Sequence, residues 1–337
     1  MQIAKVKASA LGGWHDAVTR SGLDPIALTD EVNLDRSVWQ DPGSHITLKS
    51  FVNLSESVVN TSGLKTLPWL VGERYDLRQL DEVGTAVLSA SNLGSSLTRL
   101  ADHFSLLQDA TEMSFQASDD VATISYRILD PDIWPRHYDA LFTLGIVAQI
   151  VKRAVGTSWD RAELHFEAEA RSSRCEFSSA LGANCVFGAD ANEIRMPVSF
   201  LNLPMPTVCT NGDLKLLSKK LVQKRRAMPI TDRVATIIFR EMNDGPLCQE
   251  RLGAEIGMSS RTMRRKLAAE GISYQDILDD CRMRQAALDF HARPELSISQ
   301  VALRLGYSEH STFTRAFTRW SGTAPQQFRR TMAKEAH

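Results

Sequence analysis

The chain has 337 residues, of which 43% are hydrophobic and 23% are charged. This is the composition of a globular protein of about two domains, and it excludes a disordered chain, a collagen, a disulfide miniprotein and a polytopic membrane protein. The 39 Lys and Arg residues nearly balance the 40 Asp and Glu residues, for a formal net charge of −1. Taken alone, that sum argues against a nucleic-acid partner, but it hides how the charge is distributed.

Charge divides the chain near residue 210. The first 210 residues hold 17 Lys and Arg against 26 Asp and Glu, a net of −9, whereas the remainder holds 22 against 14, a net of +8. An acidic half joined to a basic half indicates two tasks, and the basic half suits a polyanion. Pro204 and Pro206 disfavour a helix between the halves. We expect a first domain over 1–205, a linker over 206–230 and a second domain over 231–337.

No segment predicts export or membrane insertion. The first residues lack the apolar core of a signal peptide, and the most apolar stretch, Ala140–Val151, is shorter than the about 20 residues that span a bilayer. The cysteines are odd in number, scattered and without a C-x-x-C pair: Cys175, Cys185, Cys209, Cys248 and Cys281. We therefore expect reduced thiols in a cytoplasmic protein with no metal site, no cofactor and no membrane partner.

The acidic half mixes helical and strand-like patterns. Apolar residues recur at helical spacing in three segments, 47–60, 84–107 and 136–155. Strand-like patterns mark four segments, 112–116, 121–129, 163–168 and 193–200. The expected fold of this half is α+β, with mixed helices and a small sheet, and it contains no glycine-rich nucleotide-binding motif.

One cluster of polar and aromatic residues precedes the third helical segment. Trp134, Arg136, His137 and Tyr138 occur together at a junction between loop and helix. Such residues can line a ligand pocket, which makes them weak candidates for effector binding. Packing at the edge of the domain is the simpler role.

The basic half contains one pattern twice. A short apolar helix ends at a glycine, a polar turn follows, and two apolar residues stand four positions apart. The residues are Gly257, Met263 and Leu267 in the first copy and Gly306, Phe313 and Phe317 in the second. Glycine adopts the left-handed conformation that ends a helix, and residues four apart share a helix face. Each copy is therefore a predicted helix-turn-helix, at about 249–268 and about 297–319.

The connection between the copies predicts a rigid spacer. Residues 273–290 form one helical pattern of about 25 Å, Pro294 ends it, and 297–300 is a capping box for the second copy. Successive major-groove faces of B-DNA recur every 34–36 Å or so. The expected fold of the basic half is all-α, with two helix-turn-helix units joined by a long linker helix that lets both reach DNA.

These residues resemble the DNA-binding domain of the AraC/XylS family of bacterial transcription regulators. The resemblance covers 252–330, and it is strongest over 306–328, where a Phe-x-x-x-Phe helix precedes a Gly-x-x-Pro-x-x-Phe-Arg tail. It implies DNA contacts by Ser260, Arg261, Arg264 and Arg265, then by His310, Ser311, Thr312, Arg315 and Arg319. For His310 a phosphate is as suitable a target as a base, and Arg319 suits a phosphate or a surface salt bridge. Trp320 and Phe328 are expected in the core.

The acidic half more loosely resembles the arabinose-binding-like effector or dimerisation domain of a subgroup of these regulators. Residues 7–10, 67–72 and 84–100 carry the resemblance. It implies effector binding, dimerisation or both. Because helices dominate the first hundred residues, the domain does not resemble the cupin barrel of sugar-sensing members.

The expected function is a bacterial transcription regulator, by family habit an activator, modulated through its first domain by a small-molecule effector or by dimerisation. Expected partners are double-stranded promoter DNA, RNA polymerase, an effector and a second copy of the chain. The alternative is a DNA-binding regulator whose first domain is enzyme-like or only dimerises. The chain lacks a G-x-S-x-G nucleophile elbow and an H-E-x-x-H metal motif, so we do not expect an enzyme.

Overall fold

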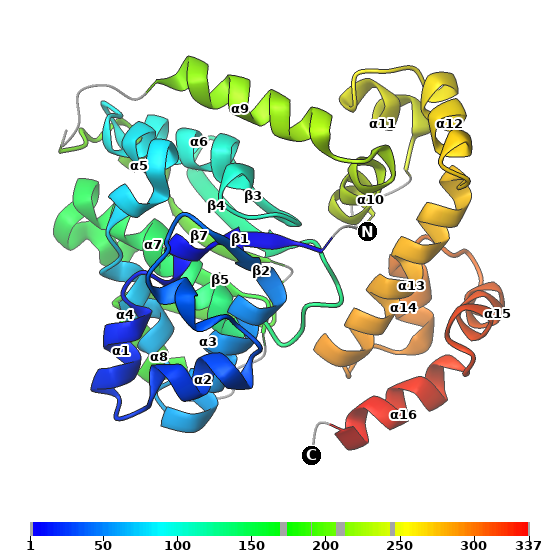
Figure 1. The fold of residues 1–337 in the computed structure, drawn as a ribbon, viewed down its shortest axis with the longest axis horizontal. Coiled ribbons are helices and arrows are strands. Elements are labelled where there is room, and N and C mark those ends of the chain that lie inside the picture. Colours follow the sequence, from blue (N-terminus) through cyan, green and yellow to red (C-terminus); the bar gives the residue numbers. More distant parts are fainter. Residues whose placement is uncertain (1–2, 169–173, 190, 207–212, 243–246, 336–337) are drawn as a thin grey trace. The chain divides into compact units, whose positions relative to one another are not determined.

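The computed structural model of the chain describes residues 3–168, 174–189, 191–206, 213–242 and 247–335 (Figure 1). Within them the chain forms two compact units. The N-terminal unit comprises 3–128 and 135–224, and the C-terminal unit comprises 129–134 and 225–335. The C-terminal unit therefore includes a short segment from the first half of the chain. Cys209, one of the expected thiols, lies outside the described residues.

The N-terminal unit combines helices with two sheets. Its strands are β1 (Lys5–Lys7), β2 (His45–Thr47), β3 (Thr111–Ala117), β4 (Val121–Ile128), β5 (Glu163–Phe166), β6 (Asn184–Phe187) and β7 (Asn192–Pro197). Its helices are α1 (Trp14–Arg20), α2 (Pro25–Glu31), α3 (Leu48–Ser62), α4 (Leu67–Glu73), α5 (Asp81–Leu88), α6 (Leu93–His103), α7 (His137–Val155) and α8 (Arg174–Leu181). Helix α9 (Leu214–Ala227) crosses the boundary between the units. The expected α+β class, with a small sheet and no cupin barrel, is confirmed.

The larger sheet has the strand order β3-β4-β7-β5-β6. All neighbours are antiparallel except β5 and β6, and in the β3–β4 hairpin Met113 pairs with Tyr126. Side chains alternate between the two faces of a strand. On β4, Ala122, Ile124 and Tyr126 are buried, whereas the residues between them are half-buried. One face of the sheet is thus covered by the core helices.

Helix α7 is the central helix of the N-terminal unit. It packs most extensively on α4 and also contacts α3, α6 and the sheet. Two glycines allow the close approach of α4: a Cβ atom on Gly72 would lie 2.1 Å from the Phe142 carbonyl oxygen, and one on Gly145 would lie 2.6 Å from that of Trp69. By length and composition alone, residues 137–161 could cross a membrane. Leu141, Leu144 and Val147 of α7 are buried in the core of the unit.

The C-terminal unit is helical throughout its described residues, apart from loops and turns. It contains α10 (Ile230–Glu241), α11 (Gln249–Glu255), α12 (Ser260–Ala269), α13 (Tyr274–Ala292), α14 (Ile298–Arg304), α15 (His310–Ser321) and α16 (Pro325–Glu335). One apolar cluster joins these helices, with Val234, Met263 and Phe313 fully buried within it. In Figure 1, α13 runs from the end of α12 towards α14 and α15. The expected all-α fold with a long linker helix is confirmed.

One expected helix was wrong in its extent. The pattern over 84–107 is divided between α5 and α6, followed by a 3-10 turn. Asn92 ends the continuity, because its extended backbone lets its side chain accept a hydrogen bond from the Ser95 amide and cap a new helix. The apolar periodicity continues across the break, so periodicity alone did not reveal it.

Candidate nucleic-acid interface

The first helix-turn-helix consists of α11 and α12. Gly257 ends the first helix with φ +76°, in the left-handed region, and the Ser259 hydroxyl caps α12 by accepting a hydrogen bond from the Thr262 amide. A Cβ atom on Gly253 would lie 2.8 Å from the Met258 carbonyl oxygen, so the two helices meet backbone to backbone. These local features fix the angle at which α12 leaves the turn.

Helix α12 has one buried face and one basic face. Met263 and Leu267 are fully buried, whereas Arg261, Arg264 and Arg265 are exposed and form no ion pair within the described part of the chain. Ser260, at the start of the helix, is half-buried, and its hydroxyl donates a hydrogen bond to Glu250 Oε1 at 3.3 Å. The three guanidinium groups are available to an external partner.

The second helix-turn-helix repeats the arrangement with α14 and α15. Ser297 and Gln300 form the expected capping box, Gly306 has φ +79°, and Phe313 and Phe317 are fully buried. The other face of α15 is exposed and carries His310, Ser311, Thr312, Arg315 and Arg319. The Ser311 hydroxyl donates to Glu309 Oε2 at 3.3 Å. This face is less basic than that of α12 and richer in hydroxyl groups.

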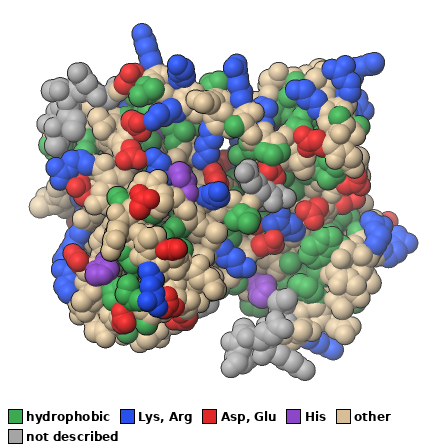
Figure 2. Space-filling view, viewed as in Figure 1, with side chains coloured by type: hydrophobic (Ala, Val, Ile, Leu, Met, Phe, Trp, Pro, Cys, Tyr) green, Lys and Arg blue, Asp and Glu red, His purple; other side chains and the backbone are tan. Residues whose placement is uncertain are grey.

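Helix α13 connects the two recognition helices, α12 and α15. Its 19 residues correspond to about 28 Å at the α-helical rise. Ser273 and Asp276 cap its start reciprocally. In Figure 2, Lys and Arg side chains lie over both α12 and α15. All the residues that the sequence resemblance implies as DNA contacts therefore lie on α12 or α15, and all except the half-buried Ser260 are exposed.

One aromatic residue was placed wrongly from the sequence. Trp320 is 43% exposed, although its ring contacts Phe317 and its indole N–H donates to Asp280 Oδ1 at 3.4 Å. It extends past the end of the core face of α15 because it follows Phe317 by three residues and Gly322 ends the helix two residues later. Phe328 is half-buried and stacks edge-on against Phe317.

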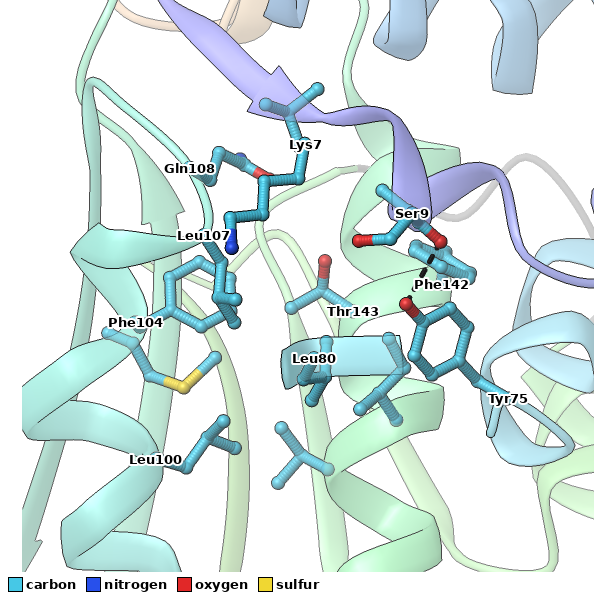
Figure 3. Close-up of a pocket in the computed structure, with 15 residues that line it drawn as sticks. Lys7, Ser9, Tyr75, Leu80, Leu100, Phe104, Leu107, Gln108, Phe142 and Thr143 are labelled. Carbon is cyan, nitrogen blue, oxygen red and sulfur yellow. Dashed lines mark hydrogen bonds between the residues drawn. The ribbon is translucent and has the colours of Figure 1, made fainter. Parts of the chain in front are cut away.

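The N-terminal unit contains a small apolar cavity (Figure 3). Its volume is about 40 Å³, room for about three water-sized groups. Leu100, Phe104 and Phe142 contribute apolar walls, and the Lys7 side chain extends into it. The Lys7 ammonium forms an ion pair with Asp81. Sequence reasoning missed this site because its walls come from segments far apart in the chain and consist of ordinary core residues.

A buried polar chain extends from this cavity into the core. Gln108, which lines the cavity, donates from its side-chain amide to Tyr126 Oη at 2.7 Å, and Tyr126 donates to Asp139 Oδ2 at 2.7 Å. Burial raises the pKa of Asp139 to about 7, despite the Tyr126 hydrogen bond that opposes this shift. Oδ1 of Asp139 has no hydrogen-bond partner among the described residues. Asp139 is thus a buried carboxyl whose pKa lies well above the ordinary range of aspartate.

The four weak effector candidates do not line this cavity. Arg136 is buried, forms a bidentate ion pair with Glu167 and donates to the Ile128 carbonyl oxygen at 2.9 Å. His137 and Tyr138 are in ring contact, and Tyr138 is buried. Trp134 belongs to the C-terminal unit.

Two known protein domains match most of the chain. The arabinose-binding domain found at the N-terminus of AraC transcription regulators matches residues 22–205, and a helix-turn-helix domain matches 252–331. The chain belongs to the AraC family of transcription regulators. As a member of this family it is a DNA-binding transcription regulator of AraC type, and the helix-turn-helix domain matched over 252–331 is a DNA-binding part.

Several AraC-type proteins are similar to this one over nearly the whole chain. The ornithine utilization regulator of Pseudomonas aeruginosa is 26% identical, and the match covers 93% of each chain. The regulator VirS of Mycobacterium tuberculosis is 21% identical over 96% of each. The crystal structure of the regulator CdpR from Pseudomonas aeruginosa covers 94% of this chain and 96% of its own, with 19% identity and a TM-score of 0.46.

Proposed function

We propose that this AraC-type regulator contacts promoter DNA with both recognition helices through the residues Ser260, Arg261, Arg264, Arg265, His310, Ser311, Thr312, Arg315 and Arg319. The observation that carries this proposal is the common geometry of α12 and α15. Each helix buries its apolar residues completely and leaves these polar residues on its outer face, with only Ser260 partly covered. A recognition helix in the major groove requires this division of its faces.

The side-chain chemistry supports distinct tasks for the two helices. The exposed guanidinium groups of Arg264 and Arg265 suit bidentate contacts to guanine, the commonest specific contact in the major groove. The hydroxyl groups of Ser311 and Thr312 can hydrogen-bond several bases or phosphates. The length of α13, about 28 Å, together with the width of the helices at its ends, suits recognition helices on successive turns of the groove.

Substitution of Arg264 or Arg265 by alanine tests the base contacts. We expect a loss of about 1–3 kcal/mol at a specific site and a relaxed sequence preference. Lys266→Ala is the matched control, since Lys266 is exposed on the same helix and is not proposed to contact a base. The measurement is competition between specific and scrambled duplexes. Equal losses on both duplexes for the arginine variants would place Arg264 and Arg265 on phosphates instead.

We also propose a division of labour along the chain, with an effector-binding or dimerisation domain over 1–205, a linker over 206–230 and the DNA-binding domain over 231–337. The cavity of the N-terminal unit supports effector binding. A ligand larger than about three water-sized groups would need the Lys7 side chain to move, and the Lys7 ammonium pairs with the exposed carboxylate of Asp81. Family habit supports activation with RNA polymerase as a partner, and a location in the cytoplasm.

A thermal-shift screen of metabolites tests the effector proposal, because a ligand that binds the native state raises apparent stability by mass action. A hit that acts through the cavity should lose its shift in Thr143→Phe, which fills the cavity, and keep it in Ser118→Ala, an exposed control on the β3–β4 turn. A hit that also changes DNA affinity supports effector control. Stabilisation unchanged in Thr143→Phe would move the effector site elsewhere.

A further inference from the structure

The C-terminal unit is completed by residues 129–134, the segment between β4 and α7. Leu129 is 6% exposed and belongs to the apolar cluster that also contains Phe239 of α10 and Met283 of α13. This segment is separated from the rest of the unit by about 90 residues of sequence and is nevertheless assigned to it by its contacts. It is the only described part of the first half in that unit.

Arg284 of α13 forms hydrogen bonds with two aspartates of this segment. Its Nη2 donates to Asp130 Oδ1 at 2.8 Å and to Asp132 Oδ2 at 2.6 Å, and its Nε donates to Asp132 Oδ1 at 3.3 Å. The guanidinium also lies 5.6 Å from the centre of the Phe239 ring. The Arg284 side chain is only 11% exposed and that of Asp130 only 14%. We call these three charged residues the Arg284 clamp.

Two of the three clamp residues, Arg284 and Asp130, are nearly buried, whereas the Asp132 side chain is 63% exposed, so the buried pair is the one between Arg284 and Asp130. A surface ion pair contributes little, whereas removing one partner of a buried pair leaves an uncompensated charge and is strongly destabilising. The Arg284 guanidinium lies against the Phe239 ring, so it cannot exchange the Asp130 carboxylate for water without leaving that ring. The clamp therefore selects one arrangement of the segment on α13.

The clamp lies where a change in it can alter DNA contacts, because it acts on the helix between the two helix-turn-helix units. Arg284 lies near the middle of α13, the helix whose two ends carry the first and second helix-turn-helix units. The segment continues directly into β4, which contains Tyr126, and through two further residues into α7, which contains Asp139 and Thr143. A change in these elements of the N-terminal unit thus has a covalent route of a few residues to the spacer of the DNA-binding unit.

We infer that residues 129–134 are a working part of the DNA-binding unit, in which Asp130 and Asp132 are positioning residues that act through Arg284 on α13. The segment fixes the spacer helix and thereby the separation at which α12 and α15 meet DNA. This inference rests on the proposed function, since it requires that both recognition helices contact DNA.

The test uses variants of the whole chain and two DNA duplexes. The first duplex is one that the parent chain selects from a random pool. The second is the same duplex lengthened by one or two base pairs between its two preferred blocks. The variants are Arg284→Glu, the pair Asp130→Arg with Asp132→Arg, and the combination of all three. The readout is the ratio of affinities for the original and lengthened duplexes, because a ratio cancels the effect of net charge. Asp119→Arg, on an exposed turn of the N-terminal unit, is the control for charge.

We expect the parent and Asp119→Arg to prefer the original duplex at least tenfold. Arg284→Glu and the aspartate pair should reduce this ratio at least threefold, and the triple variant should restore most of it. Circular dichroism checks that each variant is folded. If Arg284→Glu does not fold, the milder pair Asp130→Asn with Asp132→Asn replaces it and should reduce the ratio in the same direction.

An unchanged ratio in the folded clamp variants, with the parent still selective, would overturn the inference and leave the proposed function intact. The inference is also overturned if the affinity ratio of the triple variant is no closer to that of the parent than the ratios of Arg284→Glu and the aspartate pair. A general weakening of the structure would not be repaired by combining these substitutions, whereas a restored ion pair would raise the ratio again. A parent chain that selects no sequence from the pool would instead contradict the proposed function.

Discussion

Arg264 and Arg284 are both arginines on helices of the C-terminal unit, and their surroundings suit them to opposite tasks. Arg264 is exposed and has no ion-pair partner among the described residues, whereas the Arg284 side chain is only 11% exposed, lies against Phe239 and is shared by two carboxylates. The first is free to exchange water for a base edge; the second is committed to an internal contact. Residue type alone does not separate these roles, because sequence gives no direct measure of burial.

Among single residues, Asp139 is the one expected to make the stability of the fold depend on pH. Burial raises its pKa to about 7 in the folded chain, above the value of about 3.9 expected after unfolding. Between these values the folded state binds a proton that the unfolded state has released, so stability falls as pH rises from about 4 to about 7 and levels off above it. Asp139→Asn should remove this contribution.

The measurement is the free energy of unfolding of parent and Asp139→Asn at several pH values. The difference between them should change in favour of the variant by up to about 1.4 kcal/mol per pH unit between pH 5 and 7, the limit for one proton. Comparing the two proteins cancels the other titrating groups. A difference independent of pH would mean that Asp139 ionises normally in the folded chain.

At the scale of elements, close contacts between backbones set the angles that the recognition helices require. Gly253 is the example in the first helix-turn-helix, where α11 meets the start of α12. A Cβ atom at this position would lie 2.8 Å from the Met258 carbonyl oxygen and 3.0 Å from the Ser260 nitrogen. Neither is the flexible end of a side chain, so the backbone itself would have to move.

Gly253→Ala should therefore destabilise the C-terminal unit by about 1–3 kcal/mol, the usual cost of overpacking, and weaken DNA binding through α12. The control is Ala254→Ser, at the next, exposed position of the same helix. Thermal unfolding and DNA affinity are the measurements. If Gly253→Ala behaved like the control in both, the close approach of α11 and α12 would not be needed.

The helix-turn-helix units could be predicted from sequence because their determinants are local. Helix periodicity, the glycines Gly257 and Gly306, and the caps Ser259 and Ser297 all act within a few residues, and the structure contains each of them. The Arg284 clamp could not be predicted, because Asp132 lies 152 positions from Arg284. The short strands β1 and β2 were missed for the same reason, since each is three residues long and stabilised by its distant partner.

At the scale of the whole molecule, the net charge of −1 is the sum of two opposite halves, and the structure refines the division between them. Lys220 and Lys224 of α9 form ion pairs with Glu82 and Asp109 within the N-terminal unit. Residues 225–337 keep 18 Lys and Arg against 13 Asp and Glu. The basic charge available to DNA therefore resides in the helix-turn-helix units more than in α9.

This assignment predicts the salt dependence of DNA binding. Each phosphate contact contributes about 0.9 to the slope of log affinity against log salt. Lys220→Ala should leave the slope unchanged, because its ammonium is paired with Glu82, whereas Arg319→Ala should reduce it by about 1 if Arg319 contacts a phosphate. A reduced slope for Lys220→Ala would show that α9 contacts DNA after all.

The central claim is that two recognition helices on one spacer contact two turns of the major groove. It is tested most directly by the sequences that the parent, Arg264→Ala and Arg315→Ala select from a random DNA pool. The account predicts two preferred blocks about ten base pairs apart for the parent, with Arg264→Ala losing preference in one block and Arg315→Ala in the other. A single preferred block, or both variants losing preference in the same block, would contradict it.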